Sequence, residues 1–87
     1  MIPYLQQRKR LDANLPAAVT MLRALIADDK YMAYVCEVAV ERHEDGFAQY
    51  GDQLMRSEDY RLECDVLEEL ADALVYLAEK AARERDA

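Results

Sequence analysis

Apolar residues recur at helical spacing through the last third of the chain. Projected at 100° per residue, one face of this segment is largely apolar and holds Tyr60, Leu67, Leu70, Ala71, Leu74, Ala78 and Ala81. The other side holds Asp65, Glu69, Asp72 and Tyr76. With Ser57 as an N-cap and no internal Gly or Pro, the pattern predicts a helix to about Glu84, roughly 40 Å long.

Two shorter helices are expected before it. Asn14 followed by Pro16 is typical of a helix start, and apolar spacing continues from there to about Ala27. Asp28 and Asp29 can cap a second helix from about Lys30 to near Gln49. Gly51 then offers a left-handed helix end.

The second helix is apolar around most of its circumference, and a narrow stripe of Glu37, Glu41 and Glu44 remains. A helix of this kind is usually buried on several sides. The last helix is also long for so small a chain and needs a partner to cover it. We therefore expect an all-α helical bundle of about three helices per chain, completed by homo-oligomerisation as a homodimer or homotetramer.

Composition agrees with a small helical domain. The chain has 87 residues, of which 53% are hydrophobic, and Gly and Pro together number only four. This leaves little turn chemistry for a sheet and favours one domain over residues 1–87. Residues 1–13 are expected to form a polar N-terminal arm, in which the basic run Arg8-Lys9-Arg10 is solvated.

A formal net charge of −7 excludes several partners. A polyanion needs a basic surface, so binding to nucleic acid or to an anionic membrane is not expected. No apolar run approaches the roughly 20 residues that span a bilayer, and the N-terminus lacks a signal-peptide core, so we expect a cytoplasmic protein. Cys36 and Cys64 lack metal-ligand spacing and are expected to be reduced, buried thiols.

Two pairs of carboxylates carry the candidate chemistry. Glu41 and Glu44 lie three apart on the second helix, as do Glu69 and Asp72 on the third. Residues at this spacing share a face, so antiparallel packing of the two helices would bring four carboxylates together. Such a cluster needs a counter-charge, and Mg²⁺ prefers oxygen ligands of this kind. The plainer interpretation is that these acids simply form the wet faces of amphipathic helices.

The order of these pairs resembles a known signature. Glu41-Arg-His-Glu44, followed after 24 residues by Glu69-Leu-Ala-Asp72, is similar to the ExxE…ExxD pattern of the MazG-like all-α nucleoside triphosphate pyrophosphohydrolases. The phrase EELADALVYL matches the second half of that signature, and FAQYG resembles the KYG or KWG turn of short phage and bacterial members. The resemblance spans roughly residues 35 to 80.

The resemblance implies a MazG-like fold and a hydrolase that cuts a nucleoside triphosphate between its α and β phosphates, releasing the monophosphate and pyrophosphate. It implies Mg²⁺ as cofactor, with Mn²⁺ as the alternative ion, and gives Glu41, Glu44, Glu69 and Asp72 as metal ligands and catalytic residues. This chain departs from the family pattern at two places. Between Glu41 and Glu44 it has Arg42 and His43, where many relatives carry small or apolar residues, and its turn lacks the lysine that is frequent there.

Three further residues are candidates for contact with the substrate. Tyr76 projects beside Asp72, where it can stack on a base or ribose. Arg42 projects into the apolar face of the second helix, so it is expected to meet an acid or a substrate phosphate. Lys80 is a phosphate candidate, although a solvated charge beside a carboxylate is the simpler interpretation.

A second function from another class fits the same pattern. The chain can be a non-catalytic helical interaction or scaffold protein, in which the acidic stripes only solvate the bundle. The two hypotheses differ in the expected response to Mg²⁺ and to loss of Glu69 or Asp72.

Overall fold

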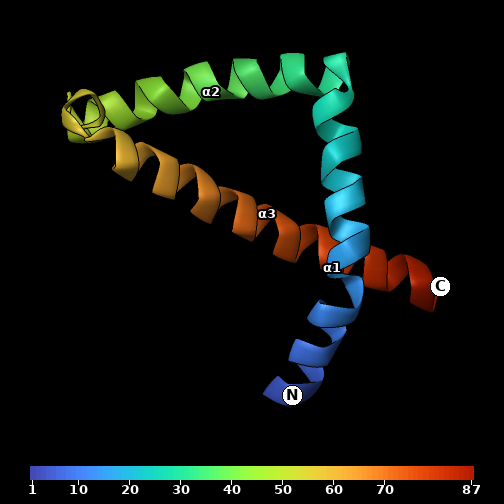
Figure 1. Ribbon diagram of the computed structural model, residues 1–87. Helices are drawn as coiled ribbons and strands as arrows, with labels where there is room; N and C mark the ends of the chain where they lie inside the picture. The colour runs from blue at the N-terminus through green and yellow to red at the C-terminus, as the bar shows by residue number, and fades with distance from the viewer.

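The computed structural model describes residues 1–87 and contains three α-helices and one short 3-10 turn. The elements in chain order are α1 (Tyr4–Ala27), α2 (Asp29–Tyr50), η1 (Leu54–Arg56) and α3 (Asp59–Asp86). No strand is present, which confirms the all-α class and the number of helices. The three helices outline an open triangle in which α1 crosses α3, while α2 runs from the end of α1 to the turn before α3 (Figure 1).

The core of the chain lies where α1 crosses α3. The buried apolar residues are all alanines, namely Ala18, Ala78, Ala81 and Ala82. Small side chains let two helix backbones approach closely, and half-buried leucines flank the contact on both helices. The expected apolar face of the third helix is therefore confirmed at Leu74, Ala78 and Ala81, which lie at this crossing.

The first helix begins ten residues earlier than the sequence pattern predicts. Tyr4 is its first residue, so residues 4–13 belong to the helix and not to a separate arm, although Arg8 and Lys9 are exposed as predicted. Asn14 does not cap the helix, because its side-chain amide donates to the Arg10 carbonyl oxygen at 2.8 Å inside it. Pro16 is accommodated within the helix. Tertiary contact with α3 explains why the local cap signal at Asn14 was misleading.

The ends of α2 agree closely with the prediction. The Asp28 carboxylate accepts a hydrogen bond from the backbone N–H of Lys30 at 2.9 Å, which confirms it as the N-cap. Gly51 ends the helix at the predicted position, and its N–H donates to the Phe47 carbonyl oxygen, but with a φ of 65° and a ψ of −132° it does not adopt the left-handed α conformation that was predicted. This positive φ explains the need for glycine at the turn.

The start of α3 differs by one residue from the expectation. Ser57 is not its cap, because the hydroxyl donates to the Gln53 carbonyl oxygen and so closes the η1 turn. Glu58 occupies the N-cap position without a side-chain capping bond, and Asp59 supplies negative charge in the first turn.

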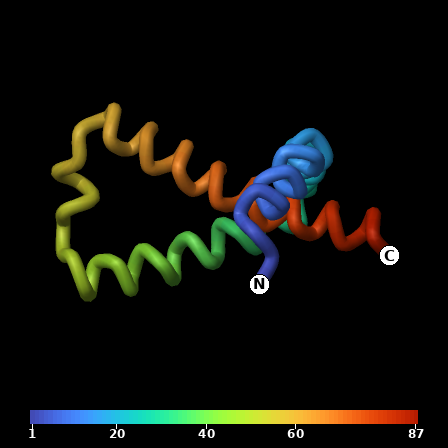
Figure 2. Tube along the Cα trace, turned by 90° about the horizontal axis from the view of Figure 1, so that it is seen from below, coloured from blue at the N-terminus to red at the C-terminus, as the bar shows by residue number.

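Helices α2 and α3 do not pack against each other within the chain: they separate from the turn onward in Figure 1, and in the view of Figure 2 the turn itself holds their adjoining ends apart. No residue of α2 is buried, although the sequence predicts a helix covered on several sides. The two cysteines are free as expected, but both are exposed, so their predicted burial is wrong for the single chain. The reason is that α1 reaches only the C-terminal half of α3 and a short stretch of α2.

Large apolar side chains are consequently exposed along both helices. On the face of α3 that was predicted to be covered, Tyr60, Leu67 and Leu70 lie beyond the reach of α1 and are exposed. None of the three helices is long and apolar enough to cross a bilayer.

Candidate functional site

The four candidate carboxylates form two separate pairs. Glu41 and Glu44 lie one turn apart on α2, and Glu69 and Asp72 lie one turn apart on α3. All four are exposed, and the helices that carry them do not touch. Nowhere in the chain do three or more His, Cys, Asp or Glu side chains gather closely enough to hold a metal ion. Within one chain the pairs therefore do not converge.

None of the four carboxylates forms an ion pair within the chain. All of the ion pairs use other acids, which are Asp12, Asp52, Glu79, Glu84 and Asp86. Residues 29–74, which we call the hairpin, contain 13 Asp and Glu and only four Lys and Arg, for a formal charge of −9. A surface with this charge attracts cations, and a divalent ion more strongly than a monovalent one.

Two of the three predicted substrate contacts lie close together. Tyr76 and Lys80 both line a shallow depression of about 450 Å³ on α3, together with Val75, Glu79 and Arg83. The Tyr76 side chain is exposed one turn after Asp72 and points into solvent. Lys80 is paired with Glu84, as the simpler interpretation of this lysine predicts.

Arg42 lies apart from that depression, on α2. It is exposed and makes no ion pair or side-chain hydrogen bond within the chain. The acid that was expected to meet it is therefore not supplied by its own chain. His43, the only histidine, is also exposed.

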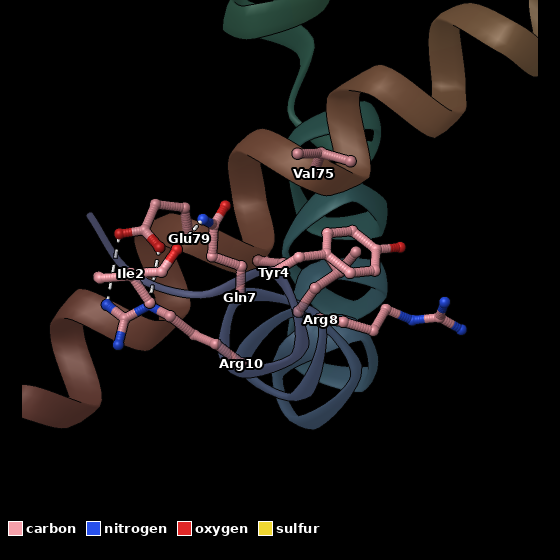
Figure 3. Close-up of a pocket in the computed structure, with 9 residues that line it drawn as sticks. Ile2, Tyr4, Gln7, Arg8, Arg10, Val75 and Glu79 are labelled. Carbon is pink, nitrogen blue, oxygen red and sulfur yellow. Dashed lines mark hydrogen bonds and ion pairs between the residues drawn. The ribbon is translucent and has the colours of Figure 1, made fainter.

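A larger groove lies between the N-terminal part of α1 and α3 (Figure 3). Its volume is about 740 Å³, and its lining residues are Ile2, Tyr4, Gln7, Arg8, Arg10, Leu11, Val75, Ala78 and Glu79. None of the predicted site residues lines it. The guanidinium of Arg10 faces Glu79 across the groove, whereas the Arg8 side chain extends away from them (Figure 3).

Arg10 anchors a polar cluster at the helix crossing that the sequence did not predict. It donates to Glu79 at 2.8 Å and to Asp86 at 2.8 Å. Arg83 donates to the same Glu79 at 2.9 Å. Hydrogen bonds from Arg10 and then Arg83 lower the pKa of Glu79 from 4.5 to about 2, and the hydrogen bonds to Glu79 and then Asp86 raise the pKa of Arg10. Arg10 and Glu79 are 69 residues apart, and nothing in the local pattern marks them as partners.

Asn14 completes this cluster, which we call the clasp and define as Arg10, Asn14, Glu79, Arg85 and Asp86. The Asn14 side-chain oxygen accepts a hydrogen bond from Arg85 at 3.3 Å. Asn14 is the one buried polar residue of the chain. Every buried side-chain polar atom has a hydrogen-bond partner. The clasp joins α1 to α3 and is not itself a candidate for catalysis, because both of its carboxylates, Glu79 and Asp86, are already paired with Arg10.

No protein-family model, curated protein or solved structure matches this chain. The resemblance to MazG-like enzymes therefore stays a hypothesis. The features of the chain itself that bear on function are the two uncompensated carboxylate pairs, the Tyr76 and Lys80 depression, and the uncovered apolar surface around them.

Proposed function

We propose that this protein is a Mg²⁺-dependent nucleoside triphosphate pyrophosphohydrolase that acts as a homo-oligomer and releases pyrophosphate and the nucleoside monophosphate. The observation that carries the proposal is that Glu41, Glu44, Glu69 and Asp72 lack positive partners on a hairpin with a formal charge of −9. Acids that served only to solvate or stabilise the helices would gain by pairing with Lys or Arg, as the acids of the clasp do.

The fit to Mg²⁺ depends on assembly. Carboxylate oxygens are suitable ligands for this ion, but one chain alone does not bring the two pairs together. A bound Mg²⁺ would neutralise charge on phosphate oxygens. The two helices must therefore be brought into register by further contacts before the proposed site exists.

Three residues of this chain would then contact different parts of the nucleotide. The exposed Tyr76 ring offers an apolar face to a base or ribose, one turn from Asp72. Lys80 lines the same depression and would exchange its partner Glu84 for a substrate phosphate. Arg42, which is unpaired in the chain, is the third candidate, either for a phosphate or for an acid of another subunit.

One observation favours the alternative, a non-catalytic scaffold. Glu41 and Glu44 lie on a helix that does not contact the helix of Glu69 and Asp72, which is the arrangement expected of acids that only face water. The two functions predict different behaviour in a direct assay.

The test is incubation of the protein with canonical and modified nucleoside triphosphates and Mg²⁺, with separate detection of pyrophosphate and orthophosphate. We expect pyrophosphate release from at least one substrate. Glu69→Gln and Asp72→Asn should each lower the rate roughly 10²-fold or more, the size typical of losing one group that stabilises charge in the transition state. Glu58→Gln, an exposed acid at the N-cap of α3 without a side-chain capping bond, is the control and should stay within about threefold of the unmodified protein, since surface changes are usually small.

Circular dichroism should show unchanged helix content in all three variants, because each side chain is exposed. Release of orthophosphate alone would contradict the proposed bond. No release from any substrate, together with a melting temperature insensitive to Mg²⁺, would favour the scaffold.

A further inference from the structure

The accessible surface of the chain is too large for a self-contained domain. It is 7825 Å², whereas a compact monomer of 10.0 kDa is expected to expose about 5,200 Å². The radius of gyration is 16.3 Å, against about 12 Å for a compact domain of this length. A dimer that covered this excess of about 2,600 Å² on each chain would bury about 5,200 Å² in total, at the upper end of the roughly 2,000–5,000 Å² that permanent interfaces bury.

The excess surface is concentrated on the hairpin. All five buried residues lie on α1 or α3, and within α3 only on the C-terminal part that α1 crosses. The same apolar face of α3 continues toward the turn at Leu70, Leu67 and Tyr60, all exposed. The uncovered part is thus a direct extension of the seam that α1 already occupies.

The acids of the proposed site do not lie on this extension. At 100° per residue, Glu69 and Asp72 project to the opposite side of α3 from Leu67 and Leu70. An apolar partner could cover Leu67 and its neighbours and leave the carboxylates accessible. Covering this face is therefore compatible with cation and substrate binding at the other.

The apolar faces of α2 and α3 also carry charged residues of both signs. At 100° per residue, Arg42 and Asp45 project into the apolar face of α2, and Glu63 lies between Tyr60 and Leu67 on α3. All three are exposed and unpaired in the chain. A two-fold interface uses the same patch on both subunits, so one chain must supply both complementary groups, as this one does. This favours a second copy of the same chain over an unrelated partner.

We infer that the hairpin face formed by α2 and the N-terminal half of α3 binds a second copy of this chain, and that the carboxylate site is incomplete without it. The requirement of the carboxylate site for a second copy rests on the proposed function, whereas the presence of the interface does not. The interface itself is argued from area, continuity and charge, so it can be tested without any assay of hydrolysis.

The experiment compares two matched leucines that are both exposed in the single chain. Leu67 on the hairpin face is 64% exposed, and Leu5 at the start of α1 is 73% exposed. Sedimentation equilibrium should give at least twice 10.0 kDa for the unmodified protein. Leu67→Glu should raise the dissociation constant about 10²-fold or more, because it buries an unpaired carboxylate, whereas Leu5→Glu should leave it unchanged.

Loss of helix in Leu67→Glu alone would also support the interface, because a change at an exposed site of a monomer should be nearly neutral. A mass of 10.0 kDa at every concentration, or an oligomer that survives Leu67→Glu, would overturn the inference. Failure of the proposed function gives a different result, namely an oligomer that Leu67→Glu dissociates but that releases no pyrophosphate. Full hydrolytic activity in a Leu67→Glu monomer would overturn the claim that the site needs the second copy.

Discussion

The crossing of α1 and α3 differs from the hairpin in how its apolar and charged side chains are partnered. At the crossing, buried alanines bring the two helices close, and the clasp pairs its charges across them. In the hairpin, large apolar side chains are exposed, and Asp52 is the one acid that forms an ion pair. Outside residues 29–74 the formal charge is +2, against −9 within them. One region satisfies its own side chains, whereas the other has groups that still need something to bind.

This difference in side-chain partnering indicates which region of so small a chain is the better candidate for function. A small domain has little surface that it can leave unsatisfied, because its margin of stability is narrow. Exposed apolar faces and uncompensated charge on the same hairpin therefore indicate a surface shaped by binding. The groove beside the clasp, although larger in volume, has its charges already paired and is the weaker candidate.

The largest expected effect on stability comes from overpacking the crossing of α1 and α3. Ala18 is fully buried, whereas its neighbour Ala17 is exposed on the same helix. Ala18→Leu should destabilise the protein by about 1–3 kcal/mol, because three extra carbons have no room between two close helices. Ala17→Leu should change stability by less than about 0.5 kcal/mol. Urea unfolding of both variants measures the difference, and equal stability would mean that the crossing is not tightly packed.

A smaller effect is expected at the turn, where two glycines of the hairpin differ in conformation. Gly51 has a φ of 65°, whereas Gly46 lies inside α2, and an added Cβ at either position would meet no atom within 4 Å. Gly51→Ala should therefore destabilise by about 1–2 kcal/mol through backbone strain alone. Gly46→Ala should stabilise by about 0.5–1 kcal/mol, because alanine restricts the unfolded chain and favours helix.

Thermal unfolding of the two glycine variants also probes the hairpin face. A gain at Gly46 that is absent in the oligomer but present in the Leu67→Glu background would mean that the second copy crowds this position. Stabilisation by Gly51→Ala would contradict the conformation of the turn.

The sequence predicted those parts of the fold that local signals determine. Asp28 and Gly51 place the ends of α2 within a residue or two, because a cap and a positive φ are properties of a few adjacent residues. The start of α1 was missed, because Asn14 and Pro16 resemble a helix start even though contact with α3 extends the helix back to Tyr4. The apolar face of α3 was predicted correctly, but only its C-terminal half is covered by this chain.

For the candidate site, sequence and structure agree only within each helix. The spacing of Glu69 and Asp72 guarantees a shared face, and α3 provides it. Whether this face meets Glu41 and Glu44 depends on how helices pack, which periodicity does not encode. The clasp shows the same limit, because Arg10 and Glu79 come together through a helix crossing and not through any spacing along the chain.

The smallest expected effect concerns the clasp and depends on pH. The pKa of Glu79 is lowered to about 2 in the folded protein, against an ordinary value of 4.5. A carboxyl whose pKa is depressed by folding contributes stability above its unfolded pKa and loses that contribution as the pH falls through the folded value. Glu79→Gln should therefore lower the melting temperature by a few degrees at neutral pH, and the difference from the unmodified protein should shrink between pH 4.5 and 2.

The matched control for this pH dependence is Glu84→Gln. It removes the exposed ion pair between Lys80 and Glu84, which lie one turn apart on α3, and leaves the contact between α1 and α3 intact. Its effect on the melting temperature should be smaller at every pH, because such pairs contribute little. Salt should reduce the effect of Glu79→Gln, since the Arg10 and Glu79 side chains are 38% and 42% exposed and solvent ions screen them. If Glu79→Gln and Glu84→Gln gave the same pH profile, the clasp would not hold α1 against α3, and the crossing would depend on its alanines alone.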